Sequence, residues 1–332
     1  MTTTSTTALI APTLNDVYLA RERIAPHVPR TPLMRHPLLD DATGLTLWVK
    51  HENHNPTGAF KVRGGLNLVG AMSAEERARG IVTASTGNHG QSIALASRIH
   101  GVQATVFVPD GNNPEKNAAI RAFGATVEEG GKDFDDARGH CEQRANATGA
   151  RYVHSADEPL LIAGVGTYAL EVFEDLPNAD VVFVALGGGS GACGLITVRN
   201  ALGARARIIG VGAANADGVY RSWKGPGRVV GESAQTFAEG IATRVSFDLP
   251  FSIYKQYLDD FVLLTEEELA EGVRMALKTT HNLPEGAGSA SIAAAYKLRQ
   301  TLAEQRVVCI MSGGNIDAAK LKWVLSADDL SA

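Results

Sequence analysis

The sequence predicts an α/β protein made of two open, twisted lobes, and three observations lead to this fold class. Short runs rich in β-branched residues alternate with helix-like segments, which is the pattern of parallel strands connected by helices. The runs are apolar throughout, as expected for strands that are buried on both faces of a sheet. At 332 residues the chain is too long for one ordinary core, so we expect two lobes that share a cleft.

Seven runs are predicted as strands. They cover residues 47–50, 81–85, 104–109, 125–129, 181–186, 207–212 and 306–311. Four helices are predicted between them, at residues 74–80, 89–101, 114–124 and 266–279. The first three of these helices end at glycine, the residue favoured just past a helix C-terminus. One copy of the alternating pattern runs through about residue 147, and a second copy follows it.

The composition argues against several classes of protein. Apolar residues make up 45% and charged residues 20% of the chain, which is typical of a folded globular protein. A formal net charge of -5 and the lack of a Lys/Arg run argue against a nucleic-acid partner. No apolar stretch reaches the roughly 18 residues that span a bilayer. The N-terminus does not resemble a secretory signal, so we expect a cytoplasmic protein without a membrane partner. Its first dozen residues are rich in threonine and are expected to be frayed.

The cysteines are predicted to be reduced thiols. Cys141, Cys193 and Cys309 are far apart in the sequence and form no CxxC pair. Cys309 lies in an apolar run, where a buried structural cysteine is expected rather than a nucleophile.

Lys61 is the candidate reactive amine. It lies in the segment NPTGAFKVRGG, where Phe60, Val62 and Arg63 could supply the apolar or cationic surroundings that lower an amine pKa. An ordinary lysine, with a pKa of about 10.4, is a poor nucleophile at neutral pH. On this segment alone, an exposed lysine without a chemical role is the alternative.

A polar turn follows the predicted strand 81–85, at the end of the sheet where open α/β folds bind ligands. It contains Ser85, Thr86, Gly87, Asn88 and His89. Its hydroxyls and backbone N–H groups could bind a carboxylate. A helix cap with a polar turn explains the same residues equally well.

A glycine-rich turn follows the predicted strand 181–186. It contains Gly187, Gly188, Gly189, Ser190 and Gly191 and leads into a helix. Glycines let backbone N–H groups approach an anion, and a helix N-terminus adds aligned donors, so the turn could bind a phosphate. It does not match a nucleoside-triphosphate loop, and no acidic residue ends the next strand as in a Rossmann site. An ordinary tight turn is the alternative. Ser312 lies in a third such turn, MSGGNID, where a helix cap is the simpler explanation.

In this order and spacing, the four segments closely resemble fold-type II pyridoxal-phosphate enzymes. The sequence is most similar to their serine/threonine dehydratase and serine racemase branch, which shares the PLMRHPLL, AEG and PEGAG segments. The resemblance implies a fold like that of the tryptophan synthase β-subunit, with pyridoxal 5'-phosphate in the cleft between the lobes. Residues 1–54 and 148–332 would form the large cofactor-binding domain, and residues 55–147 the small α/β domain. The resemblance also implies a homodimer.

The resemblance assigns roles at the cofactor. Lys61 would bind the cofactor aldehyde as an imine and later move the substrate Cα proton. Phe60 would pack against the ring, and Asn88 would hydrogen-bond to its phenolic oxygen. Ser312 would contact the pyridine nitrogen. The backbone amides of the turn would bind the phosphate, with a further hydroxyl from Ser190; these residues are Gly187, Gly188, Gly189, Ser190 and Gly191.

The resemblance also assigns the substrate site and the reaction. Ser85, Thr86, Gly87 and His89 would hold the substrate carboxylate, with Thr86 at the position of the racemase's proton-donating serine. A neutral hydroxyl at Ser312 does not keep the ring nitrogen protonated as a carboxylate would, so elimination at Cβ is favoured over transamination. The expected activity is a dehydratase, or ammonia-lyase, that converts a β-hydroxy amino acid such as L-threonine or L-serine to a 2-oxo acid and ammonia.

Several alternatives stay open. Within enzymes they are a hydroxyaspartate or phenylserine dehydratase, a serine racemase, and a β-replacement enzyme of the cysteine synthase type. A non-catalytic α/β ligand-binding protein is the alternative from another class. His51 and His54 would mark a less common hydroxy amino acid as substrate, or they are surface histidines before a turn.

Two departures from the family pattern carry expectations. Gly212 and Gly218 stand where relatives often have a Glu and an Asp that bind a divalent cation, and Asp217 is a poor substitute by register, so no metal is expected. The chain ends soon after MSGGNID, so we expect a catabolic type without a regulatory domain.

Overall fold

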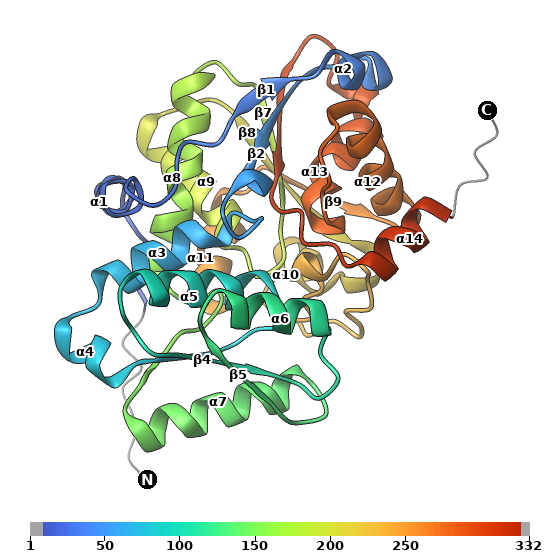
Figure 1. Cartoon of the computed structure of the whole chain (residues 1–332). Helices are drawn as coiled ribbons and strands as arrows, with labels where there is room; N and C mark the ends of the chain where they lie inside the picture. Colours follow the sequence, from blue (N-terminus) through green and yellow to red (C-terminus); the bar gives the residue numbers. More distant parts are fainter. Residues whose placement is uncertain (1–8, 327–332) are drawn as a thin grey trace.

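The computed structural model describes residues 9–326 and contains two β-sheets that are covered by helices (Figure 1). The larger sheet contains, in spatial order, β1 (Leu33–Arg35), β2 (Thr46–His51), β10 (Arg306–Met311), β7 (Val181–Ala185), β8 (Arg207–Ala213) and β9 (Asp260–Leu264). The smaller sheet contains β5 (Thr126–Glu129), β4 (Ala104–Val108), β3 (Ile81–Ala84) and β6 (Arg151–Tyr152). Neighbouring strands are parallel, except that β1 is antiparallel to β2.

The helices fall into two groups along the chain. Those up to residue 148 are α1 (Leu14–Ile24), α2 (Pro37–Thr43), α3 (Lys61–Ala71), α4 (Ala74–Arg79), α5 (Asn88–Ile99), α6 (Pro114–Ala122) and α7 (Phe134–Thr148). Those after it are α8 (Pro159–Asp175), α9 (Ser190–Leu202), α10 (Gly218–Lys224), α11 (Asp248–Tyr257), α12 (Glu266–Thr280), α13 (Gly286–Lys297) and α14 (Ala318–Ser326). Short 3-10 helices are η1 (Glu52–His54), η2 (Ala214–Ala216), η3 (Glu239–Ile241) and η4 (Arg299–Thr301).

The predicted α/β fold class is confirmed. All seven predicted strands and all four predicted helices are present, with ends within two residues of the expected ones. The prediction missed β1, β6 and β9, together with α1, α2, α7 and most helices after residue 148. Of the N-terminal residues expected to be frayed, residues 1–8 lie outside the described range.

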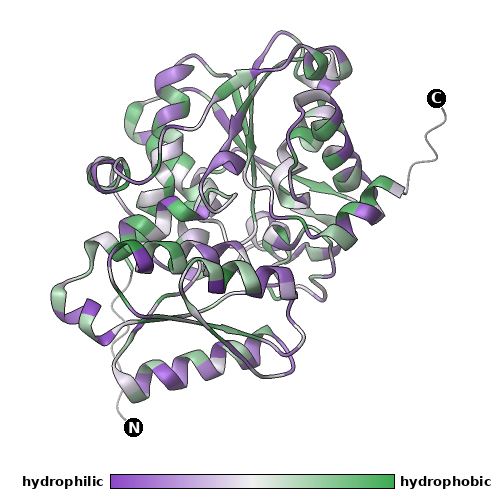
Figure 2. Ribbon diagram, viewed as in Figure 1, coloured by the Kyte–Doolittle hydropathy of each residue, from purple (hydrophilic) through white to green (hydrophobic). Residues whose placement is uncertain are grey.

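The central strands of the larger sheet are buried on both faces, as their continuous apolar sequence predicts. Val182 and Val184 of β7 face one core cluster, whereas Val181 and Phe183 face the other. In Figure 1, α8 and α9 cover one face of this sheet, and α12 and α13 cover the other. Figure 2 shows α7, at the edge of the molecule, with hydrophilic and hydrophobic residues alternating, as expected for a helix with one exposed face.

α8 is the helix that joins the two lobes. It is buried from Leu161 to Phe173 and packs against both α3 and α9. Both contacts are made at glycines: a Cβ on Gly164 would lie 2.5 Å from the Arg63 carbonyl oxygen, and one on Gly194 would lie 2.9 Å from the Gly166 nitrogen. Because glycine lets these backbones approach closely, α8 holds the start of α3 near the start of α9.

The pairing of β6 with β3 places residues 151–152 in the smaller sheet, past the predicted boundary at residue 147. The division into residues 55–147 and the rest of the chain stays a prediction. We call the part built on the smaller sheet the small lobe and the part built on the larger sheet the large lobe. In residues 9–326, no helix combines the length and the apolar character that crossing a bilayer requires.

The three cysteines are free and buried. Burial raises the pKa of the Cys141 thiol to about 12 and also raises the pKa of the Cys309 thiol. A thiol that stays protonated is a poor nucleophile, which supports a structural role for Cys309.

Candidate active site

Lys61 points into the protein, so the reading of an exposed lysine was wrong. It is the first residue of α3, and its Nζ lies 3.0 Å from Ser190 Oγ and 3.3 Å from the Ser155 carbonyl oxygen. Burial lowers the pKa of the Lys61 amine to about 8. A much larger fraction of this amine is therefore neutral near pH 7 to 8 than for an ordinary lysine.

Of the two expected causes, apolar surroundings and a cationic neighbour, only the first lowers the pKa of Lys61. Arg63 was a candidate for repelling the charge of Lys61, but desolvation by burial accounts for the shift. The charge of Arg63 is matched by two buried carboxylates, because its guanidinium forms ion pairs of 2.7 Å with both Glu52 and Glu171. Lys50 completes this buried network with a 2.5 Å ion pair to Glu171. The network has two positive and two negative groups, and sequence reasoning missed its acidic partners.

Backbone and side-chain bonds bring the other motifs to Lys61. The Phe60 N–H donates to the Ser312 carbonyl oxygen over 3.0 Å, and Ala59 forms a β-bridge with Gly313. From α5, the Ser92 hydroxyl donates to the Lys61 carbonyl oxygen over 2.6 Å. The lysine segment is thus held by the C-terminal turn of the large lobe and by a helix of the small lobe.

The glycine-rich turn leaves the N-terminus of α9 uncapped beside Lys61. α9 begins at Ser190, and no side chain caps this end. Gly189 has a φ of +97°, which strongly favours glycine. A Cβ on Gly187 would overlap the carbonyl oxygen of Gly240, and one on Gly191 would touch Phe60 and Tyr168 at 3.6 and 3.3 Å. An anion at this turn would meet aligned backbone donors next to the amine of Lys61.

Part of the polar turn before α5 is used in hydrogen bonds within the turn itself. Ser85 Oγ accepts the backbone N–H groups of Gly87 and Gly90 at 3.3 and 2.9 Å, so Ser85 acts as a cap. Thr86 makes no hydrogen bond to another residue within the described range, so its hydroxyl is available for a ligand. His89 is buried with Nε2 3.0 Å from Thr83 Oγ1, and burial lowers its pKa well below the usual value. The neutral ring offers no charge to a carboxylate, so the predicted contact would come from the His89 backbone N–H.

Asn88 and Ser312 lie at the meeting point of the lobes. Asn88 Nδ2 donates to Glu285 Oε1 over 2.7 Å, and Asn315 Nδ2 donates to Asn88 Oδ1 over 2.8 Å. Glu285 is buried, and burial raises the pKa of its carboxyl. Ser312 is buried, and its hydroxyl donates to the Ala287 carbonyl oxygen over 3.3 Å. Glu285 and Asn315 lie in the quoted PEGAG and MSGGNID segments, but sequence reasoning gave neither a role.

The two histidines before the lysine segment, His51 and His54, differ in their burial. His51 is fully buried, so the reading as a surface histidine was wrong for this residue. Its Nε2 lies 2.9 Å from His36 Nε2, and burial lowers the pKa of His51 to about 4. His54 is exposed and bonded to Asn282. Neither histidine is hydrogen-bonded to Lys61, Asn88 or the glycine-rich turn.

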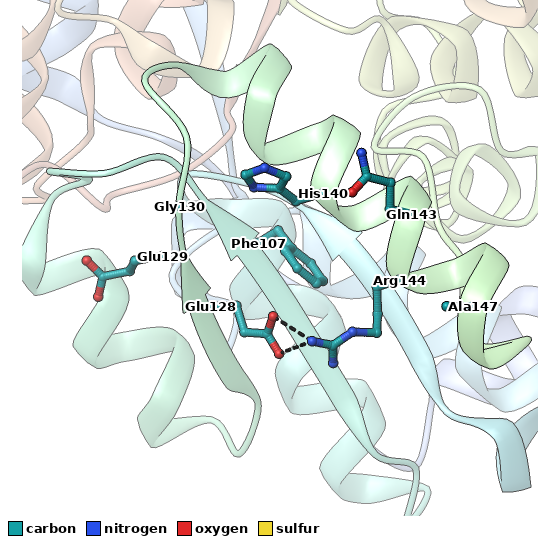
Figure 3. A pocket seen from close by; sticks show the side chains of 8 residues that line it. All are labelled: Phe107, Glu128, Glu129, Gly130, His140, Gln143, Arg144 and Ala147. Atoms are coloured by element: carbon teal, nitrogen blue, oxygen red, sulfur yellow. Dashed lines mark hydrogen bonds and ion pairs between the residues drawn. The ribbon is translucent and has the colours of Figure 1, made fainter.

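Figure 3 shows a surface pocket of the small lobe that carries none of the predicted site residues. It is lined by Phe107, Glu128, Glu129, Gly130, His140, Gln143, Arg144 and Ala147. Helix α7 forms one wall, on the face of the small sheet opposite α5 (Figure 1). The described residues contain no group of three or more His, Cys, Asp or Glu side chains suited to a metal ion.

Comparison with known proteins agrees with this geometry. The family model described as pyridoxal-phosphate dependent enzyme matches residues 24–313. The L-threonine ammonia-lyase of Geobacter sulfurreducens is 37% identical over 307 residues, which cover 92% of this chain and 76% of that protein. The processed threonine deaminase isoform 2 of Solanum lycopersicum superposes with a TM-score of 0.89 at 28% identity, covering 97% of this chain and 98% of that one. Maize serine racemase superposes with a TM-score of 0.90 at 27% identity, covering 96% of this chain and 98% of that one. The chain therefore belongs to the family of pyridoxal-phosphate dependent enzymes, of fold type II.

Proposed function

We propose that this enzyme is a dehydratase, or ammonia-lyase, that eliminates water from a small β-hydroxy amino acid such as L-threonine or L-serine. The observation that carries the proposal is the partly buried Lys61 amine beside the uncapped start of α9, in a site whose turn after β10 presents the hydroxyl of Ser312. The names of the Geobacter and tomato relatives, a threonine ammonia-lyase and a threonine deaminase, support the same reaction.

The residues present fit pyridoxal 5'-phosphate. Lys61 offers a partly buried amine of lowered pKa for the aldehyde. Backbone donors for the phosphate come from the turn of Gly187, Gly188, Gly189, Ser190 and Gly191. Phe60 lies beside Lys61, with its ring centroid 5.3 Å from Nζ, and would pack on the cofactor ring. Asn88 and Ser312 would contact the phenolic oxygen and the ring nitrogen. When bound, the cofactor supplies an electron sink for the pair of electrons left at the substrate Cα.

Lys61 is the proposed base. With substrate bound, the Lys61 amine would take the Cα proton, which requires that this amine be neutral. Its pKa of about 8 makes it a base of suitable strength near neutral pH. Ser312 is a neutral hydroxyl, so it does not keep the ring nitrogen protonated as a carboxylate would. Loss of the β-hydroxyl together with the Cα proton suits this arrangement better than transamination.

The substrate carboxylate is proposed to bind at the turn before α5. Thr86 would offer its hydroxyl and His89 its backbone N–H, while Ser85 and Gly87 hold the turn in shape around them. A panel of L-threonine, L-serine, threo-3-hydroxyaspartate and 3-phenylserine, scored for ammonia and 2-oxo acid, tests the proposal. Formation of a 2-oxo acid from none of them would refute it, and turnover of only the last two would narrow it to a hydroxyaspartate or phenylserine dehydratase.

Serine racemisation is the second candidate, because the structure superposes closely on maize serine racemase. The resemblance places Thr86 where a racemase has the serine that reprotonates Cα, and the extra methyl of threonine crowds that face. We therefore propose racemisation as a side activity at most. Measuring D-serine formed from L-serine tests this, and Thr86→Ser is expected to raise the yield. A β-replacement activity of the cysteine synthase type would appear instead as product formed only when a thiol is added.

We also propose a homodimer located in the cytoplasm and without a bound metal. These points rest on the family resemblance and on the sequence, including Gly212 and Gly218 in place of metal-binding carboxylates. Light scattering coupled to size exclusion tests the dimer, and activity after chelator treatment tests the lack of a metal.

A further inference from the structure

We propose that Asn315 is a positioning residue that fixes the amide of Asn88, so that Asn88 presents an N–H group to the cofactor. A side-chain amide has a donor and an acceptor of similar size, and only its partners decide which end faces a ligand. An acceptor on the cofactor, such as its phenolic oxygen, needs the nitrogen end. This inference rests on the proposed position of Asn88 beside the phenolic oxygen.

The orientation of Asn315 is fixed first. Its Nδ2 donates to the Thr57 carbonyl oxygen and to Asn88 Oδ1, both over 2.8 Å. A backbone carbonyl can only accept, so the nitrogen end of Asn315 has to face Thr57. The two hydrogens of this nitrogen are both used. Asn315 Oδ1 lies over Gly58, where an added Cβ would be 2.7 Å away, so the missing side chain of Gly58 leaves the space that Asn315 occupies.

The orientation of Asn88 follows from that of Asn315. Since Asn315 offers a hydrogen, Asn88 has to turn its oxygen toward it, and its nitrogen then points the other way. There Nδ2 donates one hydrogen to Glu285 Oε1 over 2.7 Å. The second hydrogen stays available for the cofactor. Two side chains from distant parts of the chain, Asn315 and Glu285, thus determine which atom of Asn88 would face the ring.

Replacing the donor group of Asn315 by an acceptor should reverse the orientation of the Asn88 amide. In Asn315→Asp a carboxylate oxygen would face the Thr57 carbonyl, and Asn88 would have to rotate to donate to the new carboxylate. Asn88 would then direct its oxygen toward Glu285 and the cofactor oxygen, so a favourable contact becomes a repulsive one. Because a hydrogen bond to a charged acceptor contributes roughly 1.5–3 kcal/mol, we expect the affinity for pyridoxal phosphate to fall about tenfold or more.

The experiment is a double-mutant cycle read without substrate. The dissociation constant of pyridoxal phosphate and the visible spectrum of the bound cofactor are measured for the wild type, Asn315→Asp, Asn88→Ala and the double variant. We expect each single variant to weaken binding and shift the visible band. Adding Asn315→Asp to Asn88→Ala should change the affinity by less than about threefold, because Asn315 acts through Asn88.

Two further variants provide a control and a replacement in case Asn315→Asp does not fold. Asn282→Asp is the matched control: Asn282 Nδ2 also donates to a backbone carbonyl, that of Thr280, over 2.8 Å, but its side chain is not bonded to Asn88. It should leave the spectrum unchanged. If Asn315→Asp does not fold, Asn315→Ala removes the donor without adding charge and should weaken binding less but shift the band in the same direction. Equal effects of the Asn315 change in both backgrounds, or an unshifted spectrum, would overturn the proposal. A failure of the dehydratase assay alone would not, because no substrate is used here.

Discussion

Replacing the buried Arg63 by methionine should destabilise the protein more than the same replacement of an exposed arginine. Arg63 is 1% exposed, and its guanidinium donates to Glu52 at 2.7 and 2.9 Å and to Glu171 at 2.7 and 2.9 Å. Methionine has a similar length but leaves two buried carboxylates with only Lys50 to balance them. Breaking a buried ion pair by removing one partner costs about 3–5 kcal/mol, so we expect a loss of this size in the free energy of unfolding.

The pH dependence of this loss is a second, independent readout. In the wild type, Arg63 helps to lower the pKa of Glu171, so the pair stabilises the protein above the carboxyl's unfolded pKa and loses that effect as the pH falls. Without Arg63, burial raises the carboxyl pKa instead, and protonation relieves the penalty. The difference between the variant and the wild type should therefore be largest near pH 8 and shrink toward pH 5.

Urea unfolding followed by circular dichroism at these two pH values measures both effects. The matched control is Arg306→Met, which breaks the ion pair with Asp180, where both side chains are more than a third exposed. Exposed pairs contribute about 0–1 kcal/mol, so this control should change little. A loss for Arg63→Met no larger than that of the control, or one that does not change with pH, would show that Arg63 does not stabilise the buried carboxylates.

Two further predictions concern the site itself. Gly187→Ala should lower the affinity for pyridoxal phosphate about tenfold or more, because its Cβ overlaps the Gly240 carbonyl oxygen and the turn has to move; Gly227→Ala, where the space is open, is the control. Unchanged binding in Gly187→Ala would argue against a phosphate at this turn. In protein freed of cofactor, the rate at which acetic anhydride labels Lys61, followed by peptide mass, should rise with pH around a midpoint of about 8. A midpoint near the ordinary lysine value would show that the amine is not desolvated.

The elements that could be predicted from the sequence are those whose signal is local. The strands of the sheet centres are continuous apolar runs, and helices such as α6 begin with Asn113 as cap and Pro114 at the first turn. α8 was missed because it is buried on all sides from Leu161 to Phe173, so its sequence shows no continuous polar face. β1 and β6 have three and two residues and exist only because a neighbouring strand pairs with them.

The residues of the site also divide into those with a local sequence pattern and those whose roles depend on distant partners. Lys61 and the glycine-rich turn stand out because each carries a local pattern, and the fold brings them within 3.0 Å of one another. The partners of Asn88 could not be read from the sequence, because Glu285 and Asn315 are 197 and 227 positions away. The burial of His89 depends in the same way on packing against the small sheet, which turns its ring toward Thr83.

The role of Lys61 is tested by identifying the residue that holds the cofactor. Borohydride reduces an imine to a stable amine, so treating the enzyme loaded with pyridoxal phosphate, digesting it and measuring peptide masses locates the bond. We expect the mass of the reduced cofactor on the peptide that contains Lys61, and neither this mass nor the colour in Lys61→Ala. Labelling of another lysine, such as Lys116, or colour that survives in Lys61→Ala, would contradict this role of Lys61.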